Sequence, residues 1–192
     1  MRFILASASP RRRELLARHG LFPEVLPAGV VEDEAPDTPP RVMVLHNAVL
    51  KARYIAHQFP DALVIGADTT VAIDDTVLNK PADMEGARAM LRRLSGREHT
   101  VYTGVAIVCA AHGVDESHCV TSRVRFKTLT EAVITAYFQR VDPLDKAGAY
   151  GIQEGRELII ADYDEPVSNI MGLPVEFVVE RLNALGFAGT LA

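Results

Sequence analysis

Short apolar runs alternate with helix-like segments along the sequence, and this alternation limits the possible folds more than any other feature. Strands or hairpins are predicted over residues 2–7, 23–27, 62–68, 69–79, 98–127 and 158–162. Helices are predicted over residues 10–19, 40–57, 83–95, 128–141 and 174–185, and Thr128 with Glu131 is predicted to form the capping box of the fourth. The hairpin of residues 69–79 is predicted to turn at Asp74 and Asp75. Strands interleaved with helices are typical of an α/β or a mixed α+β layered fold. We therefore expect a layered protein in which helices pack on a sheet.

The chain has the size and composition of one ordinary globular domain, which we expect to span residues 1–192. It contains 192 residues, of which 48% are hydrophobic and 23% charged, without an internal repeat or a low-complexity linker. Its formal net charge of -5 argues against a protein that coats nucleic acid, because such proteins carry a basic surplus that neutralises phosphates. Any basic site must therefore be local.

The apolar segments are too short for a signal peptide or a membrane span. The opening sequence MRFILASAS has an apolar run of about four residues, whereas a signal peptide needs about 7 to 15. The longest apolar run, around GVAIVCAA, falls short of the roughly 20 residues of a transmembrane helix. We therefore expect a protein of the cytoplasm that does not bind a membrane.

The two cysteines, Cys109 and Cys119, are too few for a disulfide framework and fit a reducing compartment. Together with His112 and His118 they offer four zinc ligands, but their spacing matches no common zinc pattern. A β-hairpin that turns near Gly113 is the interpretation that we favour.

Three consecutive arginines stand at the predicted start of the first helix, in the stretch LASASPRRRELL of residues 5–16. Ser9 is predicted to be the N-cap and Pro10 the first helical residue, where the missing N–H of proline costs nothing. The free N–H groups of Arg11 and Arg12 then face outward together with the positive end of the helix dipole. The dipole alone would favour acids at this position, and the arginine fork matches phosphate oxygens. We therefore predict a phosphate site.

Carboxylates form a second group, with Glu32, Asp33 and Glu34 in an acidic loop and Asp68 at the predicted end of a strand. Ligands of open α/β sheets bind outside the carboxyl ends of strands, which is where we expect Asp68. Carboxylates there could hold Mg²⁺ while phosphates complete its coordination, and one of them could activate water. Taken alone these residues indicate a solvated charge run and a turn, so their assignment depends on the phosphate site.

A lysine beside a turn and a glycine-rich segment complete the candidate groups. Lys80 precedes Pro81, which fixes the backbone and can aim the ammonium inward. The segment AGAYGIQEG has three glycines that permit close approach of a ligand, and its Gln153 can both donate to and accept from a base. Neither the P-loop pattern nor the dinucleotide-binding glycine pattern occurs. The sequence therefore does not support a P-loop kinase or a Rossmann dehydrogenase.

Five segments in this order resemble the Maf family of nucleoside triphosphate pyrophosphatases. They are LASASPRRRELL, VIGADTTVAIDDTVLNKP, LSGREHTVYTGVAIV, DKAGAYGIQ and SNIMGLPVE, and they extend from residue 5 to residue 176. The resemblance implies an α/β fold in which a mixed twisted sheet with flanking helices forms two lobes around a deep cleft. It also implies a divalent metal cofactor (Mg²⁺, Mn²⁺ or Co²⁺), hydrolysis of a nucleoside triphosphate to the monophosphate and pyrophosphate, and a homodimer.

The resemblance also assigns roles to single residues. Asp68 is similar to the family's proton acceptor, and we expect Asp68 and Glu32 to hold the metal. Glu32, Lys51 and Lys80 resemble its charged cleft residues, and Glu32 is preferred to Glu34 because it lies nineteen residues before Lys51. We expect Asp68, Glu32 and Lys80 to carry catalysis. The positions that match the family's phosphate-binding loop are Ser7, Ser9, Arg11 and Arg12.

At the positions associated with base choice, Arg11, Thr69 and Gln153, the chain is similar to the branch that acts on dTTP and UTP. Two alternatives remain open: the branch that acts on 7-methyl-GTP, and a nucleotide-binding regulator of cell division with little turnover. The chain departs from the family in the sequence DYDEPV of residues 162–167 and at Glu154, where glycine is common. If that segment contacts the nucleotide, the family pattern does not fix the substrate range or the rate of this chain, whereas the fold is unaffected.

Overall fold

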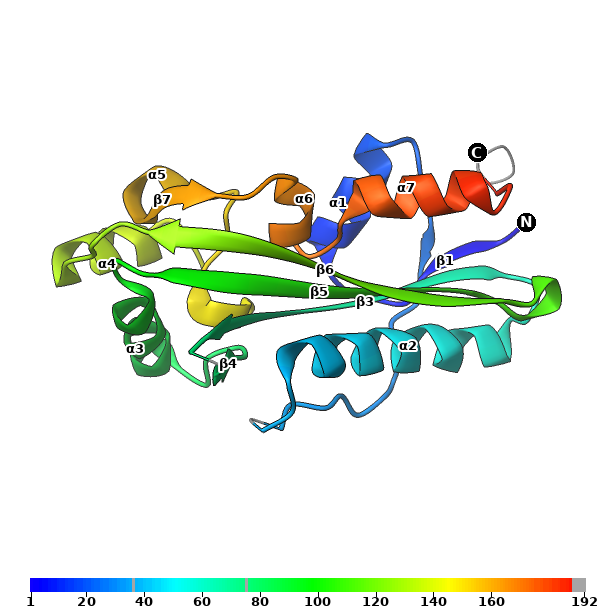
Figure 1. Cartoon of the computed structure of the whole chain (residues 1–192), viewed down its shortest axis with the longest axis horizontal. Helices are drawn as coiled ribbons and strands as arrows, with labels where there is room; N and C mark the ends of the chain where they lie inside the picture. Colours follow the sequence, from blue (N-terminus) through cyan, green and yellow to red (C-terminus); the bar gives the residue numbers. More distant parts are fainter. Residues whose placement is uncertain (36, 75, 188–192) are drawn as a thin grey trace.

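The structure is a computed structural model that describes residues 1–35, 37–74 and 76–187. Within these residues one sheet has seven strands in the order β2-β1-β3-β5-β6-β7, with β4 paired to β3 (Figure 1). The strands are β1 (Phe3–Leu5), β2 (Glu24–Val25), β3 (Leu63–Ile73), β4 (Thr76–Leu78), β5 (Glu98–Cys109), β6 (Val114–Phe126) and β7 (Ile160–Tyr163). β1 pairs in parallel with β2 and β3, and the other pairs are antiparallel. The predicted mixed sheet of an α/β fold is confirmed.

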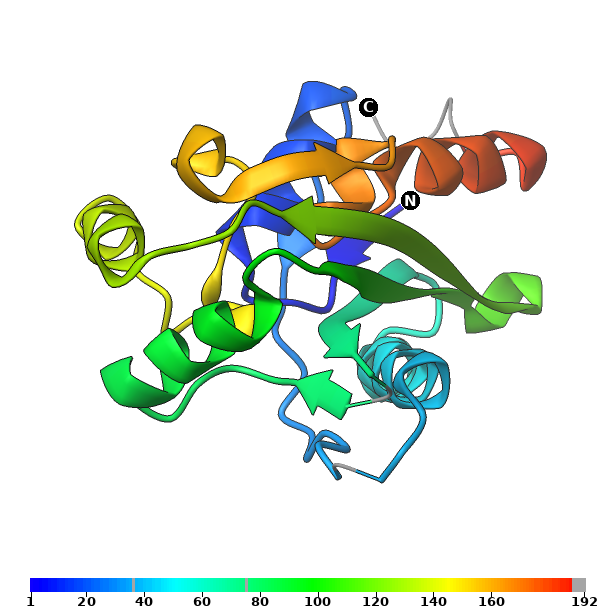
Figure 2. The same ribbon diagram turned by 60° about the vertical axis from the view of Figure 1, so that its left-hand side comes forward.

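Helices cover both faces of this sheet (Figures 1 and 2). One face carries the long helix α2 (Pro40–Gln58), and the opposite face carries α1 (Pro10–Arg18), α6 (Val167–Ile170) and α7 (Val175–Ala184). Three further helices lie near the end of the β5–β6 hairpin that is opposite its connecting turn: α3 (Met84–Leu94), α4 (Glu131–Phe138) and α5 (Arg156–Ile159). Two single 3₁₀ turns, η1 (Ala110–His112) and η2 (Ala147–Ala149), complete the list.

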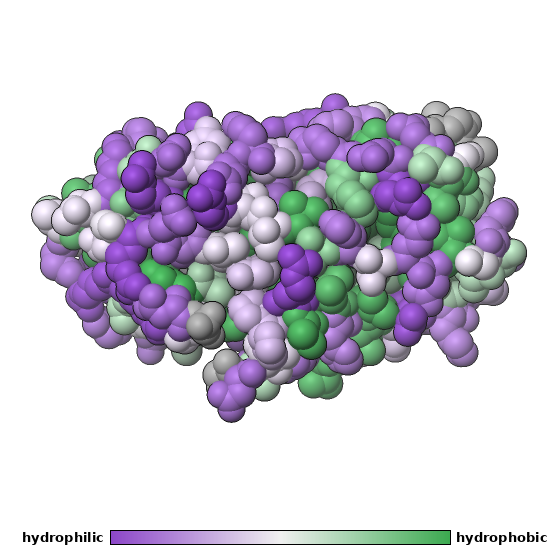
Figure 3. Space-filling view, in the orientation of Figure 1, coloured by the Kyte–Doolittle hydropathy of each residue, from purple (hydrophilic) through white to green (hydrophobic). Residues whose placement is uncertain are grey.

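The outer surface is mixed in polarity. On the face shown in Figure 3, polar residues dominate the outline and apolar residues reach the surface in separate places. Among the helices that the structure describes, none combines the length and the apolar character needed to cross a bilayer.

The side chains of β3 alternate between two hydrophobic cores. Ile65 belongs to the larger core, which includes residues of α1 and α7, and Val64 belongs to a smaller core built with α2. Successive side chains of a strand point to opposite faces of the sheet. Asp68 therefore lies on the α2 side and Thr69 on the α1 side, so one strand supplies polar groups to both faces.

β3 is longer than predicted, and the expectation that a strand ends at Asp68 is wrong. β5 pairs with β3 over residues 64–72 without interruption, which carries the strand past Asp68. On the other edge β1 pairs with residues 63–65 and β4 with residues 71–73. In the described part of the chain, residues 66–70 between them have no strand partner on that edge. Asp68 is thus at the middle of an uncovered strand edge.

The two predicted hairpins are present. In the long hairpin of β5 and β6, Cys109 pairs opposite Val114 and Cys119 opposite Gly104, so the cysteines stand at different levels of the ladder. In the short hairpin, Asp74 adopts a φ of 50° between β3 and β4. Asp75, the other predicted turn residue, lies outside the described residues.

The N-cap of α4 is Thr130, whose hydroxyl accepts the N–H of Val133. The prediction of a cap at Thr128 is wrong, because the N–H of Leu129 instead donates to Ser95 Oγ and keeps the chain outside the helix there. The helix also ends about one turn earlier than predicted. A side-chain contact from a distant loop has outweighed the local capping pattern.

Two glycines let α2 lie directly against the sheet. A Cβ at Gly66 would lie 2.3 Å from the carbonyl oxygen of Ala48, and one at Gly104 would lie 2.2 Å from that of Val44. Both distances are far below van der Waals contact. Because Gly104 pairs opposite Asp68, the close approach at these glycines brings α2 up to Asp68.

Gly104→Ala is expected to destabilise the protein by about 2 kcal/mol or more, because the new methyl group would push the backbone of α2 off the sheet. Thermal unfolding of the variant and the wild type measures this change. Gly86→Ala in α3 is the control, since the nearest atom to its Cβ would be 3.4 Å away and alanine favours a helix. Equal unfolding temperatures for Gly104→Ala and the wild type would contradict the proposed close packing.

His99 is buried against two aromatic rings. Its ring centroid is 4.9 Å from that of Phe126 and 5.4 Å from that of Tyr150, and its Nε2 lies 2.8 Å from the Tyr150 hydroxyl. Burial lowers the pKa of His99 from 6.5 to about 4. The folded protein therefore keeps a neutral His99 at pH values at which the unfolded chain protonates it.

Because only the unfolded chain takes up this proton, His99 should lower the free energy of unfolding as pH falls from about 6.5 to about 4. The expected slope reaches about 1.4 kcal/mol per pH unit. Urea unfolding over this range would measure it, and His99→Gln should show a smaller slope than the wild type because it lacks the His99 contribution. His57→Gln, at an exposed position of α2, should keep it. Identical pH profiles for His99→Gln and the wild type would show that the prediction is wrong.

Candidate active site

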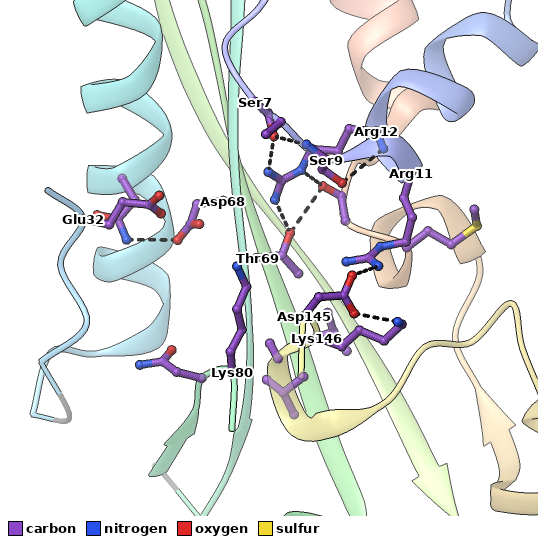
Figure 4. A pocket seen from close by; sticks show the side chains of 18 of the residues that line it. Ser7, Ser9, Arg11, Arg12, Glu32, Asp68, Thr69, Lys80, Asp145 and Lys146 are labelled. Atoms are coloured by element: carbon purple, nitrogen blue, oxygen red, sulfur yellow. Dashed lines mark hydrogen bonds and ion pairs between the residues drawn. The ribbon is translucent and has the colours of Figure 1, made fainter. Parts of the chain in front are cut away.

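A cleft of about 460 Å³ opens at the uncovered edge of β3. Its walls come from the start of α1, the acidic loop before α2, α2 itself, the loop after β4 and the segment around η2 (Figure 4). All the site residues predicted from the sequence line it, namely Ser7, Ser9, Arg11, Arg12, Glu32, Lys51, Asp68, Thr69, Lys80 and Gln153. Segments from most of the chain therefore meet in one cleft.

The start of α1 forms a cationic wall of this cleft. Ser9 caps the helix by accepting the backbone N–H of Arg12, so the cap is as predicted but that N–H is not free. The Arg12 side chain turns into the cleft, where Nε donates to the carbonyl of Gly172 at 2.7 Å. Its Nη1 donates to Ser7 Oγ at 2.9 Å and its Nη2 to Thr69 Oγ1 at 3.1 Å. These bonds use three of the guanidinium's five N–H groups and leave two for a ligand.

Arg12 remains charged at this position. Burial lowers the pKa of its guanidinium, while the nearby charges of Asp68 and Glu32 act to raise it. Arginine starts so far above neutrality that it keeps its proton in proteins. The charges of Asp68 and Glu32 act on Arg12, so the cationic wall faces a second wall of the cleft that contains these two carboxylates, here called the acidic wall.

Thr69 links Arg12 to a buried polar network. Its Oγ1 accepts from Arg12, lies 3.0 Å from Thr103 Oγ1 and lies 3.3 Å from the Gly172 carbonyl oxygen. Thr103 donates in turn to the carbonyl of Asn169. In this structure the hydroxyl of Thr69 therefore holds Arg12 in place.

Arg11 pairs with an acid in the segment before η2 rather than with Asp68 or Glu32. Its Nη1 lies 3.1 Å from Asp145 Oδ2, and the buried Lys146 donates to Asp145 Oδ1 at 2.6 Å (Figure 4). Burial acts to raise the pKa of Asp145, but Lys146 and Arg11 outweigh it and lower the pKa. An anion that binds Arg11 would therefore compete with Asp145.

Asp68 is the centre of the acidic wall. Its Oδ1 accepts from Lys51 Nζ at 3.0 Å and its Oδ2 from Asn47 Nδ2 at 3.0 Å. Lys51 also forms an ion pair with Glu32, so both predicted metal-binding carboxylates contact one cation. Burial acts to raise the pKa of Asp68, but the charges of Lys51 and Arg12 and the two hydrogen bonds hold it below its usual value. Asp68 is therefore ionised at neutral pH.

Lys80 and Gln153 also line the cleft. Lys80 follows β4, and its side chain extends into the cleft toward Asp68 and Thr69 (Figure 4). Gln153 lies after η2, where it lines the cleft together with Tyr150. The groups predicted from the sequence to contact phosphate and base thus all line one cavity.

The sequence analysis missed Asn47, Asn79 and Asp145, which also line the cleft. Asn47 lies four residues before Lys51 on α2, a spacing that puts both on one helix face and could have revealed it. No local pattern identifies the partner of Asp145, because Arg11 is 134 residues away in the sequence.

The segment 162–167, where the chain departs from its family, lies outside the cleft. None of these residues lines the cavity, and neither does Glu154, although the structure describes them all. Asp164 instead pairs with Arg123 at the surface. The departure therefore changes an outer loop rather than the walls of the site.

Fold and site together define a class of protein. A cleft in an α/β fold has the guanidinium donors of Arg12 at a helix start on one side and two carboxylates on the other. This arrangement suits a polyphosphate accompanied by a divalent cation. The class is that of enzymes that act on phosphate anhydrides.

Comparison with known proteins gives the family. The profile of Maf-like proteins matches residues 2–185. The chain is 45% identical over 184 residues to a dTTP/UTP pyrophosphatase of Akkermansia muciniphila, with 96% of each chain covered. It is 46% identical over 185 residues to the protein of that name from Moorella thermoacetica, with 96% of this chain and 95% of the other covered. It is 44% identical over 185 residues to the protein of that name from Deinococcus radiodurans, with 96% of this chain and 93% of the other covered. The chain belongs to the Maf-like protein family.

Proposed function

We propose that this chain is a pyrophosphatase that hydrolyses dTTP and UTP to the monophosphate and pyrophosphate. The observation that carries the proposal is the cleft in which Arg12 faces Asp68 and Glu32. The relatives named above carry the name dTTP/UTP pyrophosphatase and are matched over nearly their whole length. Both lines of evidence favour the same substrate class.

The triphosphate is bound by the cationic wall in this proposal. Arg12 keeps two N–H groups for phosphate oxygens, and the ammonium of Lys80, from the loop after β4, extends toward the same part of the cleft. Ser7 and Ser9 stand beside them at the helix start. Arg11 joins when phosphate replaces Asp145 as its partner.

A divalent cation, Mg²⁺, Mn²⁺ or Co²⁺, is held by Asp68 and Glu32 in this proposal. The donor set fits such an ion, because both groups are carboxylates and both already contact one cation, Lys51. Mg²⁺ commonly takes one or two carboxylates and completes its coordination with substrate phosphates. Among the described residues no group of three or more His, Cys, Asp or Glu is arranged to hold a metal. When bound, the ion would neutralise phosphate charge and acidify a water.

Asp68 orients a water molecule for attack on the α-phosphorus and accepts its proton. Its lowered pKa keeps the carboxylate available throughout the neutral range. Pyrophosphate leaves opposite the attacking water, and Arg12 and Lys80 stabilise the charge that develops on it. The reaction needs no covalent nucleophile.

The base is bound beyond the phosphates, where Gln153 lines the cleft. Its amide can donate and accept, which matches the carbonyl and N–H edge of uracil or thymine. Thr69 and Arg11 act less directly, because the hydroxyl of Thr69 holds Arg12 and the guanidinium of Arg11 contacts Asp145.

A nucleotide panel tests the proposal. Purified protein is given dTTP, UTP, CTP, dGTP and 7-methyl-GTP, each with Mg²⁺, Mn²⁺ or Co²⁺, and pyrophosphate is measured. We expect the fastest release from dTTP and UTP and none after chelation of the metal. Faster hydrolysis of 7-methyl-GTP would assign the chain to the other branch. Binding of dTTP without pyrophosphate release would favour the regulator of cell division.

We also propose that the protein works in the cytoplasm as a homodimer, as its family resemblance implies. Light scattering on the purified protein would measure its mass in solution. A mass equal to the 20.9 kDa of one chain would rule out the dimer under the conditions used.

A further inference from the structure

Asn47 of α2 joins the acidic loop to Asp68. Its Oδ1 accepts the N–H of Asp33 at 2.8 Å, and its Nδ2 donates to the carbonyl oxygen of Asp33 at 2.9 Å. The other hydrogen of Nδ2 is directed to Asp68 Oδ2, 3.0 Å away. A single side chain thus holds the loop backbone with two hydrogen bonds and the carboxylate with a third.

The geometry of this amide is fixed. Asn47 is 2% exposed, and buried polar groups without partners are strongly unfavourable. The orientation seen here gives a partner to Oδ1 and to both hydrogens of Nδ2. A flipped amide would place its NH₂ group against the N–H of Asp33 and its oxygen against the oxygens of Asp33 and Asp68. The helix that carries Asn47 is itself pressed onto the sheet at Gly66 and Gly104. Asn47 is therefore a rigid link between loop and strand.

The loop has few other attachments. Within the described residues, 29–34 also contact distant parts of the fold through the ion pair of Glu32 with Lys51 and a 3.4 Å hydrogen bond from Asn79 to the Glu34 carbonyl. The Asp33 carboxylate accepts the N–H of Ala35 and interacts with Thr38 and with the charge of His46. Glu32 directly precedes Asp33 in the chain. A shift of the Asp33 backbone would therefore move Glu32 relative to Asp68.

We infer that Asn47 is a positioning residue that sets the separation of the Glu32 and Asp68 carboxylates and thereby the affinity of the site for a divalent cation. This inference rests on the proposed pyrophosphatase function. Replacing a residue that orients metal ligands through hydrogen bonds typically changes metal affinity or activity by about 10- to 100-fold. Asn47 makes its contacts to the acidic wall alone, so phosphate binding by Arg12 and Lys80 should be spared.

The experiment compares wild type, Asn47→Leu and Asn47→Ala. Free Mn²⁺ is measured by electron paramagnetic resonance in the presence of a non-hydrolysable dTTP analogue, and kcat and KM are measured at saturating Mn²⁺. Both variants should bind Mn²⁺ at least about 10-fold more weakly. Their KM for dTTP should stay within about 3-fold, because uniform substrate binding is unchanged. A purely structural role would instead lower the melting temperature and leave the Mn²⁺ affinity of the folded protein unchanged.

His57→Leu is the control, because His57 is an exposed residue of α2 that does not line the cleft. It should bind Mn²⁺ as the wild type does. Wild-type Mn²⁺ affinity in folded Asn47→Leu and Asn47→Ala would overturn the inference and leave the proposed function standing. Failure of the wild type itself to release pyrophosphate from any nucleotide would overturn the proposed function.

A measurement on the wild type covers the case in which both variants unfold. The amide of Asp33 should exchange its hydrogen more slowly than that of Val31, because Asn47 Oδ1 accepts only the former. Equally fast exchange at both amides would overturn the inference.

Discussion

Asp68→Asn is expected to lower the rate of pyrophosphate release from dTTP by about 10³-fold, within the range that proton transfer by a positioned side chain contributes. The amide offers no negative charge to a metal ion and takes no proton from water. It also fits its surroundings poorly, because the two oxygens of Asp68 accept from Lys51 and from Asn47, and an amide would turn its own donor toward one of them. Pyrophosphate release under single-turnover conditions measures the loss.

The fold and the phosphate wall provide the controls for this variant. Asp68→Asn should still bind a non-hydrolysable dTTP analogue through Arg12, and its melting curve should remain cooperative. Asp74→Asn is the matched substitution, because Asp74 pairs with Arg97 and does not line the cleft. It should keep wild-type activity. Full activity in Asp68→Asn would remove Asp68 from the role of proton acceptor.

Arg12→Met is expected to lower kcat/KM about 10³-fold, because loss of one partner of a buried, hydrogen-bonded charge pair costs about 2 to 5 kcal/mol. The methionine keeps the apolar stem but removes the donors that Gly172, Ser7 and Thr69 accept. The protein should also lose about 2 kcal/mol of stability, since hydrogen bonds to charged groups are the stronger ones. Steady-state kinetics with dTTP and urea unfolding measure the two effects.

Arg12→Lys separates charge from geometry. A lysine retains the charge but has one ammonium instead of a planar fork, so it should recover about one tenth of the lost rate rather than all of it. Arg13→Met is the control, because Arg13 is exposed and does not line the cleft. If Arg12→Met and Arg13→Met behaved alike, the cationic wall would not depend on Arg12.

Features set by neighbouring residues could be read from the sequence. Ser9 followed by Pro10 specifies a helix start through its own side-chain acceptor and fixed φ, so the position of Arg12 followed from local chemistry. The hairpin of β5 and β6 followed from its strand pattern in the same way. The roles of Asp68 and Glu32 came from resemblance to a family rather than from spacing.

Features that depend on residues far apart in the chain could not be read from the sequence. The cap of α4 moved to Thr130 because Ser95, far away in the sequence, holds Leu129. Asn47 was overlooked: its four-residue spacing to Lys51 puts both residues on one helix face, but that spacing does not identify the partners of Asn47 in the loop and the strand. Its function depends on the loop at Asp33 and the strand at Asp68, which only the packed structure brings to it.

The sequence by itself determined most of the strands and the longer helices, the helix start that collects cations, and the family. Only the tertiary structure decided that Asp68 lies at the middle of a strand, since that depends on β5 continuing along one edge while β1 and β4 leave the other edge uncovered. The physical reason is range: backbone preferences and caps act between residues a few positions apart. The exposure of a strand edge depends on which strands pair with it and where they end.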